Sequence, residues 1–207
     1  MKVILVPGTH SWRGEASQDW FSPTSAFVGY LGGVGFTLLD TVHPYTWDTG
    51  LGGVGFGDDD LIGWQAAGIN LLHYVVPPRC KPMQVPGGLT ILITHSHGLQ
   101  PVLFAAAAGL KVDLCIDVAG PVRQDMMPTA ERARQNIRRW VHVHAGKRDW
   151  WQVWGALFDG RWGIVREHRL ADLNIPVPAA DHGDVLRNPA YFPVIGRALL
   201  QECREAP

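Results

Sequence analysis

The 207-residue chain has 18% charged residues and a formal net charge of −1, so no basic field indicates nucleic-acid binding and no acidic tail predicts disorder. A chain of this length can bury roughly 70% of its unfolded-state surface, and we expect a single domain over residues 1–207. Its three cysteines have no metal-type spacing, and no apolar run approaches the roughly 18 to 20 residues that a membrane span needs.

The first predicted strand, Val3–Val6, is a continuous apolar run that ends at Pro7-Gly8. Such a run is typical of a strand buried on both faces of a parallel sheet. It lacks the longer apolar core and the cleavage site of a signal peptide, so we expect a cytoplasmic protein. The loop after it lies at the carboxyl end of a central strand, the edge at which open α/β sheets bind ligands.

The segment before residue 90 predicts two helices and a second strand. Helical patterns cover Ser25–Leu31 and Leu61–Val75, with Pro77-Pro78 ending the second, and Val34–Val42 predicts a strand. The Gly-rich loop His43–Asp60 contains the pattern G-x-G-x-x-G. No clear strand leads into these glycines and three aspartates follow them, so dinucleotide binding is not expected.

The stretch from Thr90 to Ala108 organises the rest of the chain, because an apolar strand there turns abruptly into a helix. The β-branched run Thr90–Thr94 breaks at the four residues HSHG, and an Ala- and Leu-rich segment follows. Ser96 therefore lies at the apex of a sharp strand-to-helix turn. A serine in that position exposes its hydroxyl, and the N–H groups of the following helix point to an anion that forms beside it. The pattern predicts a nucleophile.

The second half of the chain continues to alternate between strands and helices. Strands are predicted over Asp113–Ala119, Trp140–Ala145 and His168–Ala180, and helices over Thr129–Arg139 and Tyr191–Cys203. Alternation over the whole length predicts an α/β fold with a mostly parallel central sheet and helices on both faces. The carboxyl ends of the strands then meet at one edge of the sheet.

Two later residues could activate a serine at this turn, since a serine nucleophile needs a base and the base needs a group that orients it. Asp149 follows the strand that ends at Ala145, and His182 lies in a loop after the last strand. Serine, aspartate and histidine in this chain order, at one sheet edge, are typical of the α/β-hydrolases. Asp117 is a rival for the acid and His168 a rival for the base.

On the motifs THSHG around Ser96, GKRD ending in Asp149 and DHGDVL containing His182, the chain resembles a compact α/β-hydrolase of the lipase and esterase type. The resemblance covers nearly the whole chain, with little or no cap domain. It implies a serine hydrolase that cleaves carboxylic esters through an acyl-enzyme on Ser96, with His182 as the base and Asp149 as the acid that orients it. It implies no cofactor and no metal.

The same resemblance implies an oxyanion hole formed by the backbone N–H groups of Thr9 and His97. Two positions depart from the family's pattern. Thr94 replaces the first glycine of G-x-S-x-G, and Pro7 replaces the histidine that usually precedes the oxyanion glycine. A β-branched side chain must therefore fit where the strand and the helix approach closely.

Aromatic and histidine side chains beside these motifs are candidates for a substrate pocket. His10 and Trp12 follow the first strand, and Trp150 and Trp151 follow Asp149. Large aromatic residues more often pack in a core, but this position also suits an apolar wall for an acyl group. We expect a small-molecule or lipid-like ester as the substrate, with no nucleic acid and no integral membrane contact.

Two other functions fit parts of the sequence. His95 and His97 resemble the T-H-x-H start of a metallo-β-lactamase-like site, which would make the protein a metal-dependent hydrolase, although the motif does not continue and zinc needs at least three ligands. The other alternative is a non-catalytic binding protein on a hydrolase scaffold, because a fold does not guarantee activity. The sequence carries no signal for an oligomeric state.

Overall fold

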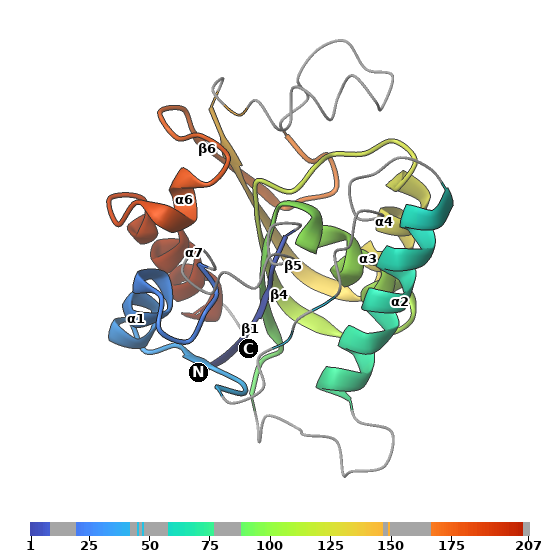
Figure 1. The fold of residues 1–207 in the computed structure, drawn as a ribbon, viewed down its shortest axis with the longest axis horizontal. Coiled ribbons are helices and arrows are strands. Elements are labelled where there is room, and N and C mark those ends of the chain that lie inside the picture. Colours follow the sequence, from blue (N-terminus) through green and yellow to red (C-terminus); the bar gives the residue numbers. More distant parts are fainter. Residues whose placement is uncertain are drawn as a thin grey trace.

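The computed structural model describes residues 1–8, 20–41, 45, 47, 58–76, 88–146, 149 and 167–204. Over these residues, parallel strands form a six-stranded sheet in the order β2-β1-β3-β4-β5-β6 (Figure 1). The strands are β1 (Lys2–Val6), β2 (Thr37–Leu38), β3 (Ile91–His95), β4 (Val112–Val118), β5 (Ile137–Ala145) and β6 (Leu173–Val177). The parallel α/β sheet that the sequence predicts is therefore confirmed.

Helices cover both faces of this sheet (Figure 1). They are α1 (Ala26–Gly33), α2 (Asp58–Val75), the 3₁₀ turn η4 (Ser96–Gly98), α3 (Leu99–Ala107), α4 (Met127–Arg134), α6 (Asp184–Arg187) and α7 (Phe192–Arg204). Helices α1 and α7 pack on one face, and α2, α3 and α4 pack on the other. None of the helices in the described part of the chain is both long and apolar enough to cross a membrane.

Two apolar clusters lie on opposite faces of the sheet, which explains the continuous apolar runs of its strands. Along β1, Val3 and Leu5 pack with α1 and α7, whereas Ile4 and Val6 pack with α2 and α3. A strand that is buried on both faces needs apolar residues at every position rather than at every second one. Burial of each large aliphatic side chain contributes roughly 1.5–3 kcal/mol to the free energy of unfolding. The apolar clusters on both faces therefore stabilise the position of β1 in the sheet.

Several predicted boundaries are wrong. The last strand, predicted over His168–Ala180, covers only Leu173–Val177, and the helix predicted from Leu61 begins at Asp58. The helix predicted over Thr129–Arg139 ends at Arg134, because Asn136 follows it and donates a side-chain hydrogen bond of 2.7 Å to a carbonyl of α3. The chain then enters β5 three residues earlier than predicted, at residue 137 rather than residue 140. Arg139 therefore projects from a strand, where its Nε lies 2.7 Å from the Glu202 carboxylate of α7.

The second strand is much shorter than the predicted Val34–Val42. Only Thr37 and Leu38 pair with β1, and Leu39 donates one further hydrogen bond of 2.8 Å to the carbonyl of Val3. The residues before them form the turn out of α1, in which Gly35 has a φ of +93°. A left-handed conformation suits glycine and ends the helix, so the strand cannot begin at residue 34. Residue 42 lies outside the described residues.

Candidate active site

Four segments that carry candidate residues end at the carboxyl edge of the sheet. Gly8 follows β1, Ser96 follows β3, Asp149 follows β5 and His182 follows β6. Because the strands are parallel, their carboxyl ends share one edge, where ligands of open α/β sheets bind. Residues that are far apart in the sequence are thereby brought to one side of the molecule.

Ser96 lies on a strained strand-to-helix turn. His95 is still extended, with φ −130° and ψ 135°, whereas Ser96 has a φ of +53° and begins η4, which runs directly into α3. A left-handed conformation at a residue other than glycine costs of order 1–3 kcal/mol and persists only where the surrounding structure enforces it. The serine is nearly buried, with 8% of its surface exposed. This is the geometry expected of a nucleophile elbow.

Two glycines allow the backbones of β1 and the elbow to approach each other. A Cβ on Gly98 would lie 2.7 Å from the Pro7 carbonyl oxygen. A Cβ on Gly8 would lie 2.9 Å from the Cβ of Ser96 and 2.8 Å from the carbonyl oxygen of His95. Real Cβ atoms do not come so close to other heavy atoms, so only glycine fits at either position. The loop after β1 therefore begins in direct contact with Ser96.

We expect Gly8→Ala to lower the free energy of unfolding by about 1–3 kcal/mol, as overpacking of a tight core contact does. Gly29→Ala is the matched control, because a Cβ on this glycine of α1 would meet nothing within 4 Å. That change should raise stability by about 0.5–1 kcal/mol, the usual gain from glycine to alanine inside a helix. Urea unfolding of both variants measures the difference, and equal stability of the Gly8 variant and the native protein would contradict the close approach.

Thr94 occupies the position of the first glycine of the elbow pattern, and a hydrogen bond accommodates it. Its side chain is fully buried, and its hydroxyl donates to Oδ1 of Asp117 on β4 at 3.2 Å. Oδ2 of Asp117 lies 2.6 Å from Nδ1 of His142 on β5. The three residues are register partners across β3, β4 and β5. Thr94 therefore belongs to a buried row of hydrogen-bonded polar side chains, which are Thr94, Asp117 and His142.

Asp149 and His182 form a hydrogen-bonded pair. Oδ2 of Asp149 lies 3.0 Å from Nδ1 of His182, and Asp149 is fully buried. Because a carboxylate only accepts, the imidazole donates from Nδ1 and its Nε2 then carries the lone pair in the neutral form. Of the two candidate acids, the structure pairs Asp149 with His182, whereas Asp117 is paired with His142. Burial of Asp149 keeps water from competing for this bond.

The loop that carries His182 is fixed at its main chain as well as at its ring. Oδ1 of Asp181 accepts hydrogen bonds from the backbone N–H groups of Gly183 at 3.0 Å and Asp184 at 2.9 Å, which is an Asx-type turn just before α6. The carbonyl oxygen of His182 lies 3.1 Å from Nε2 of His95, and the two rings are 5.0 Å apart between centroids. The histidine therefore lies beside the elbow, with 12% of its side chain exposed.

The rival base, His168, is buried elsewhere in the fold. Its ring packs 4.3 Å from that of Trp140 between centroids, and its Nδ1 accepts the backbone N–H of Leu170 at 3.3 Å. Burial lowers the pKa of His168 to about 4. Asp117 opposes this shift, and His142 and Arg169 add to it. The imidazole is therefore neutral in the folded protein near neutral pH.

We expect His168 to make the protein less stable in mild acid. The unfolded chain takes up a proton at the ordinary histidine pKa of about 6.5, whereas the folded chain does so only near pH 4. Stability is therefore fully present above pH 6.5 and falls between pH 6.5 and 4, by at most about 3 kcal/mol from this residue. Urea unfolding from pH 4.5 to 7 should show a shallower loss for His168→Gln than for the native protein, and parallel curves would contradict the effect.

His97 is held between the elbow and α2 by an aromatic partner that the sequence did not single out. Its ring stacks on that of Trp64, with centroids 5.5 Å apart and planes at 24°, and the guanidinium of Arg123 lies 4.9 Å from the Trp64 ring centroid. Burial lowers the pKa of His97 to about 3, and Arg123 and His182 add to this effect. The ring beside Ser96 is therefore uncharged. In the sequence, Trp64 shows only the spacing of an apolar helix face.

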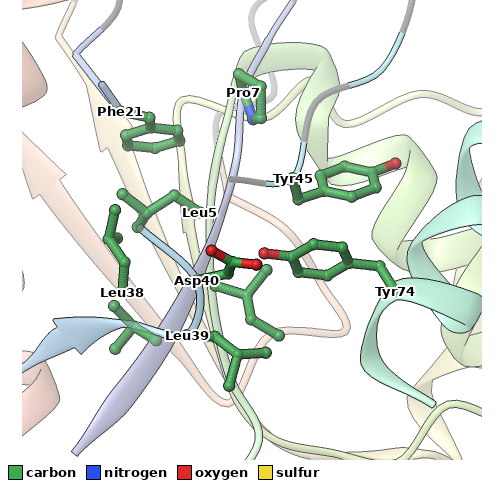
Figure 2. A pocket seen from close by; sticks show the side chains of 10 residues that line it. Leu5, Pro7, Phe21, Leu38, Leu39, Asp40, Tyr45 and Tyr74 are labelled. Atoms are coloured by element: carbon green, nitrogen blue, oxygen red, sulfur yellow. The ribbon is translucent and has the colours of Figure 1, made fainter. Parts of the chain in front are cut away.

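A small cavity lies beside β1 and β2 (Figure 2). It is bounded by β1, the start of the chain after β2, and two tyrosines, with a volume of about 20 Å³, which is room for one water molecule. The Asp40 carboxylate and the Tyr74 hydroxyl point toward each other across it, and burial followed by the charge of Asp40 raises the pKa of Tyr74. The lining of the cavity includes none of the three residues Ser96, Asp149 and His182, so we do not assign it to the candidate active site.

Several predicted site residues lie outside the described residues. These are the oxyanion residue Thr9, the pocket candidates His10, Trp12, Trp150 and Trp151, and the Gly-rich loop over residues 50–57. Within the described ranges, no three His, Cys, Asp or Glu side chains lie close enough together to hold a metal ion. Of the two histidines that flank Ser96, His95 directs its Nε2 to a carbonyl and His97 stacks on an indole.

Comparisons with known proteins identify the fold. No family model matches the sequence, and no curated protein matches it. Among solved structures, the esterase domain of a Rhodothermus marinus protein aligns over 99% of this chain and 86% of that chain, with a TM-score of 0.52 and 15% sequence identity. Polyneuridine aldehyde esterase and a mutant of it align over 97% of this chain and 98% of theirs, with 12% and 11% identity and a TM-score of 0.47.

The likeness to the first of these structures and the order of the strands together show the fold. The chain has an α/β-hydrolase fold, as the motifs in its sequence implied, and it shares this fold with an esterase domain. A fold supports many activities, so the chemistry of this protein depends on the side chains at the sheet edge.

Proposed function

We propose that this protein is a serine hydrolase that cleaves carboxylic esters through an acyl-enzyme on Ser96. The observation that carries the proposal is the hydrogen bond between Asp149 and His182, on a loop bonded to the residue that precedes Ser96. The strained φ of Ser96 supports it, because such strain is retained where a side chain must be presented. We propose residues 1–207 as one hydrolase domain.

In the first half of the reaction, Oγ of Ser96 attacks the carbonyl carbon of the ester while its proton passes to Nε2 of His182. The tetrahedral intermediate collapses with cleavage of the bond to the alcohol oxygen, and the imidazolium returns the proton to the departing alcohol. Asp149 keeps the imidazole in the tautomer that has its lone pair on Nε2 and stabilises the imidazolium when it forms. In the second half, the oxygen of a water molecule attacks the acyl carbon while His182 takes the water proton. The bond between the acyl carbon and Oγ of Ser96 then breaks, the imidazolium returns the proton to Oγ, and the carboxylic acid leaves.

The negative oxygen of the intermediate needs donors, and we propose the backbone N–H groups of His97 and Thr9. His97 lies in the first turn after Ser96, where the N–H groups of a helix have no partner within the helix. Gly8, which precedes Thr9, contacts Ser96. Two such donors typically contribute about 10²- to 10³-fold each to the rate of acyl transfer.

We propose a small-molecule or lipid-like ester as the substrate, with His10, Trp12, Trp150 and Trp151 as candidates for the walls that hold its acyl group. Aromatic side chains bury much apolar area and suit the acyl chain of such an ester.

The proposal is tested by labelling the purified protein with a fluorophosphonate probe and locating the adduct by mass spectrometry. We expect an adduct on Ser96 that does not form in His182→Ala and that a metal chelator does not affect. Hydrolysis of p-nitrophenyl esters of increasing acyl length then defines the substrate range. A folded protein that takes up no probe and hydrolyses none of these esters would falsify the proposal.

A further inference from the structure

We propose that His95 is a positioning residue that holds the main chain of the base, His182, at a fixed distance from Ser96. The proposal rests on the proposed function, since it assigns a role within the same site. Nε2 of His95 lies 3.1 Å from the carbonyl oxygen of His182. A carbonyl oxygen only accepts, so Nε2 of His95 donates, and this hydrogen bond fixes the tautomer of His95.

The peptide unit between His182 and Gly183 is held at both of its polar groups. His95 donates to its C=O at 3.1 Å, and Oδ1 of Asp181 accepts its N–H at 3.0 Å. Asp149 holds the ring of His182 separately, through Nδ1. The main chain and the ring of the base therefore have separate hydrogen-bonded anchors, and the anchor through His95 comes from the elbow.

The ring of His95 is itself fixed in this orientation. Its exposed fraction is 6%, and Trp20 packs edge-on against it, with ring centroids 4.8 Å apart and an angle of 85°. Trp20 also lies against Gly183, where a Cβ would come within 2.8 Å of its ring. On the other side, a Cβ on Gly8 would lie 3.3 Å from Nδ1 of His95. The contact with Trp20 and the close approach of Gly8 limit the rotation of this ring.

This contact shortens the structural path between the nucleophile and the base. Ser96 follows β3 and His182 follows β6, so the path through the sheet crosses β4 and β5 and spans roughly 14 Å at the usual strand spacing. Small shifts between strands add up along that path. The hydrogen bond from His95, the residue next to Ser96, connects the nucleophile and the base directly instead. Catalysis needs the base within hydrogen-bond reach of the serine hydroxyl, and a misplacement of about 1 Å can lower the rate 10²-fold.

Two substitutions of equal length separate hydrogen bonding from packing. Both His95→Gln and His95→Met fill the space with an unbranched side chain, but only glutamine places an N–H donor near the position of Nε2. We expect kcat for a p-nitrophenyl ester to fall about 10- to 100-fold in His95→Met with KM within about threefold, and to stay within about fivefold of the native value in His95→Gln. His73→Met, at an exposed histidine in the last turn of α2, is the control and should leave kcat unchanged.

The outcomes distinguish this proposal from the proposed function. If the native protein takes up no fluorophosphonate at Ser96, the proposed function fails, and the role of His95 fails with it. If the native protein is labelled and His95→Met keeps its native kcat, or if both variants lose the same activity, the role of His95 alone is overturned. Thermal unfolding checks that both variants fold. If His95→Met does not, His95→Phe, which keeps a ring against Trp20 without a donor, takes its place with the same expected loss.

Discussion

Ser96→Ala should lower kcat for ester hydrolysis by about 10⁶-fold, because the reaction loses the atom that forms the acyl-enzyme. His182→Ala should lower it to a similar degree, since an alcohol at its ordinary pKa is a poor nucleophile without its base. The double variant should be no worse than either single variant, because residues that act as a unit do not contribute additively. Initial rates with a p-nitrophenyl ester, measured on all three proteins, give the comparison.

The fold should persist in Ser96→Ala. The side chain of Ser96 is nearly buried, and alanine keeps its Cβ in contact with Gly8, so we expect an unfolding free energy within about 1 kcal/mol of the native value. Circular dichroism and urea unfolding test this directly. Retained ester turnover in folded Ser96→Ala would rule out Ser96 as the nucleophile.

Asp149→Asn should lower kcat by about 10⁴-fold while leaving KM nearly unchanged. The amide of asparagine can donate to Nδ1 of His182, which would move the ring proton to Nε2 and leave no lone pair to accept the proton of Ser96. The imidazolium would also lose its negative partner at 3.0 Å. The kinetic constants of purified Asp149→Asn test this expectation.

Asp117→Asn is the matched control, because Asp117 is equally buried and also pairs with a histidine, but with His142 rather than His182. We expect it to reduce stability, since a buried hydrogen-bonded carboxylate loses its charge, and to keep kcat within about tenfold. The opposite ranking, with the larger loss of kcat in Asp117→Asn, would make Asp117 the acid. This pair of variants therefore decides between the two candidates that the sequence offers.

The sequence predicts the strands and the elbow well because each has a local cause. The continuous apolar runs before Gly8 and Ser96 indicate strands that are buried on both faces, and the abrupt change of pattern at residues 95–98 indicates the turn. Asp149 and His182 follow from their places after strands, since parallel strands bring their carboxyl ends to one edge. The order of the motifs suggests that Asp149 and His182 pair, but the hydrogen bond between them depends on how distant segments pack.

Other features depend on contacts between distant segments and have no local signal. The boundary between α4 and β5 depends on a hydrogen bond from Asn136 to α3. The length of β2 depends on how many of its residues pair with β1. Nothing near His95 in the sequence shows that its ring reaches the carbonyl of His182, because the two residues come from different strand ends. Such tertiary contacts override the preferences of individual residues.

The buried row of Thr94, Asp117 and His142 constrains how this protein can change during evolution. Each of the three side chains satisfies its neighbour, so loss of one leaves a dehydrated polar group or an unpaired charge, which costs several kcal/mol. Joint replacement of all three by apolar side chains of similar volume avoids that cost. Acceptable sequences at these positions are therefore separated by unstable intermediates, and Thr94→Gly alone would take the hydroxyl donor from the buried carboxylate of Asp117.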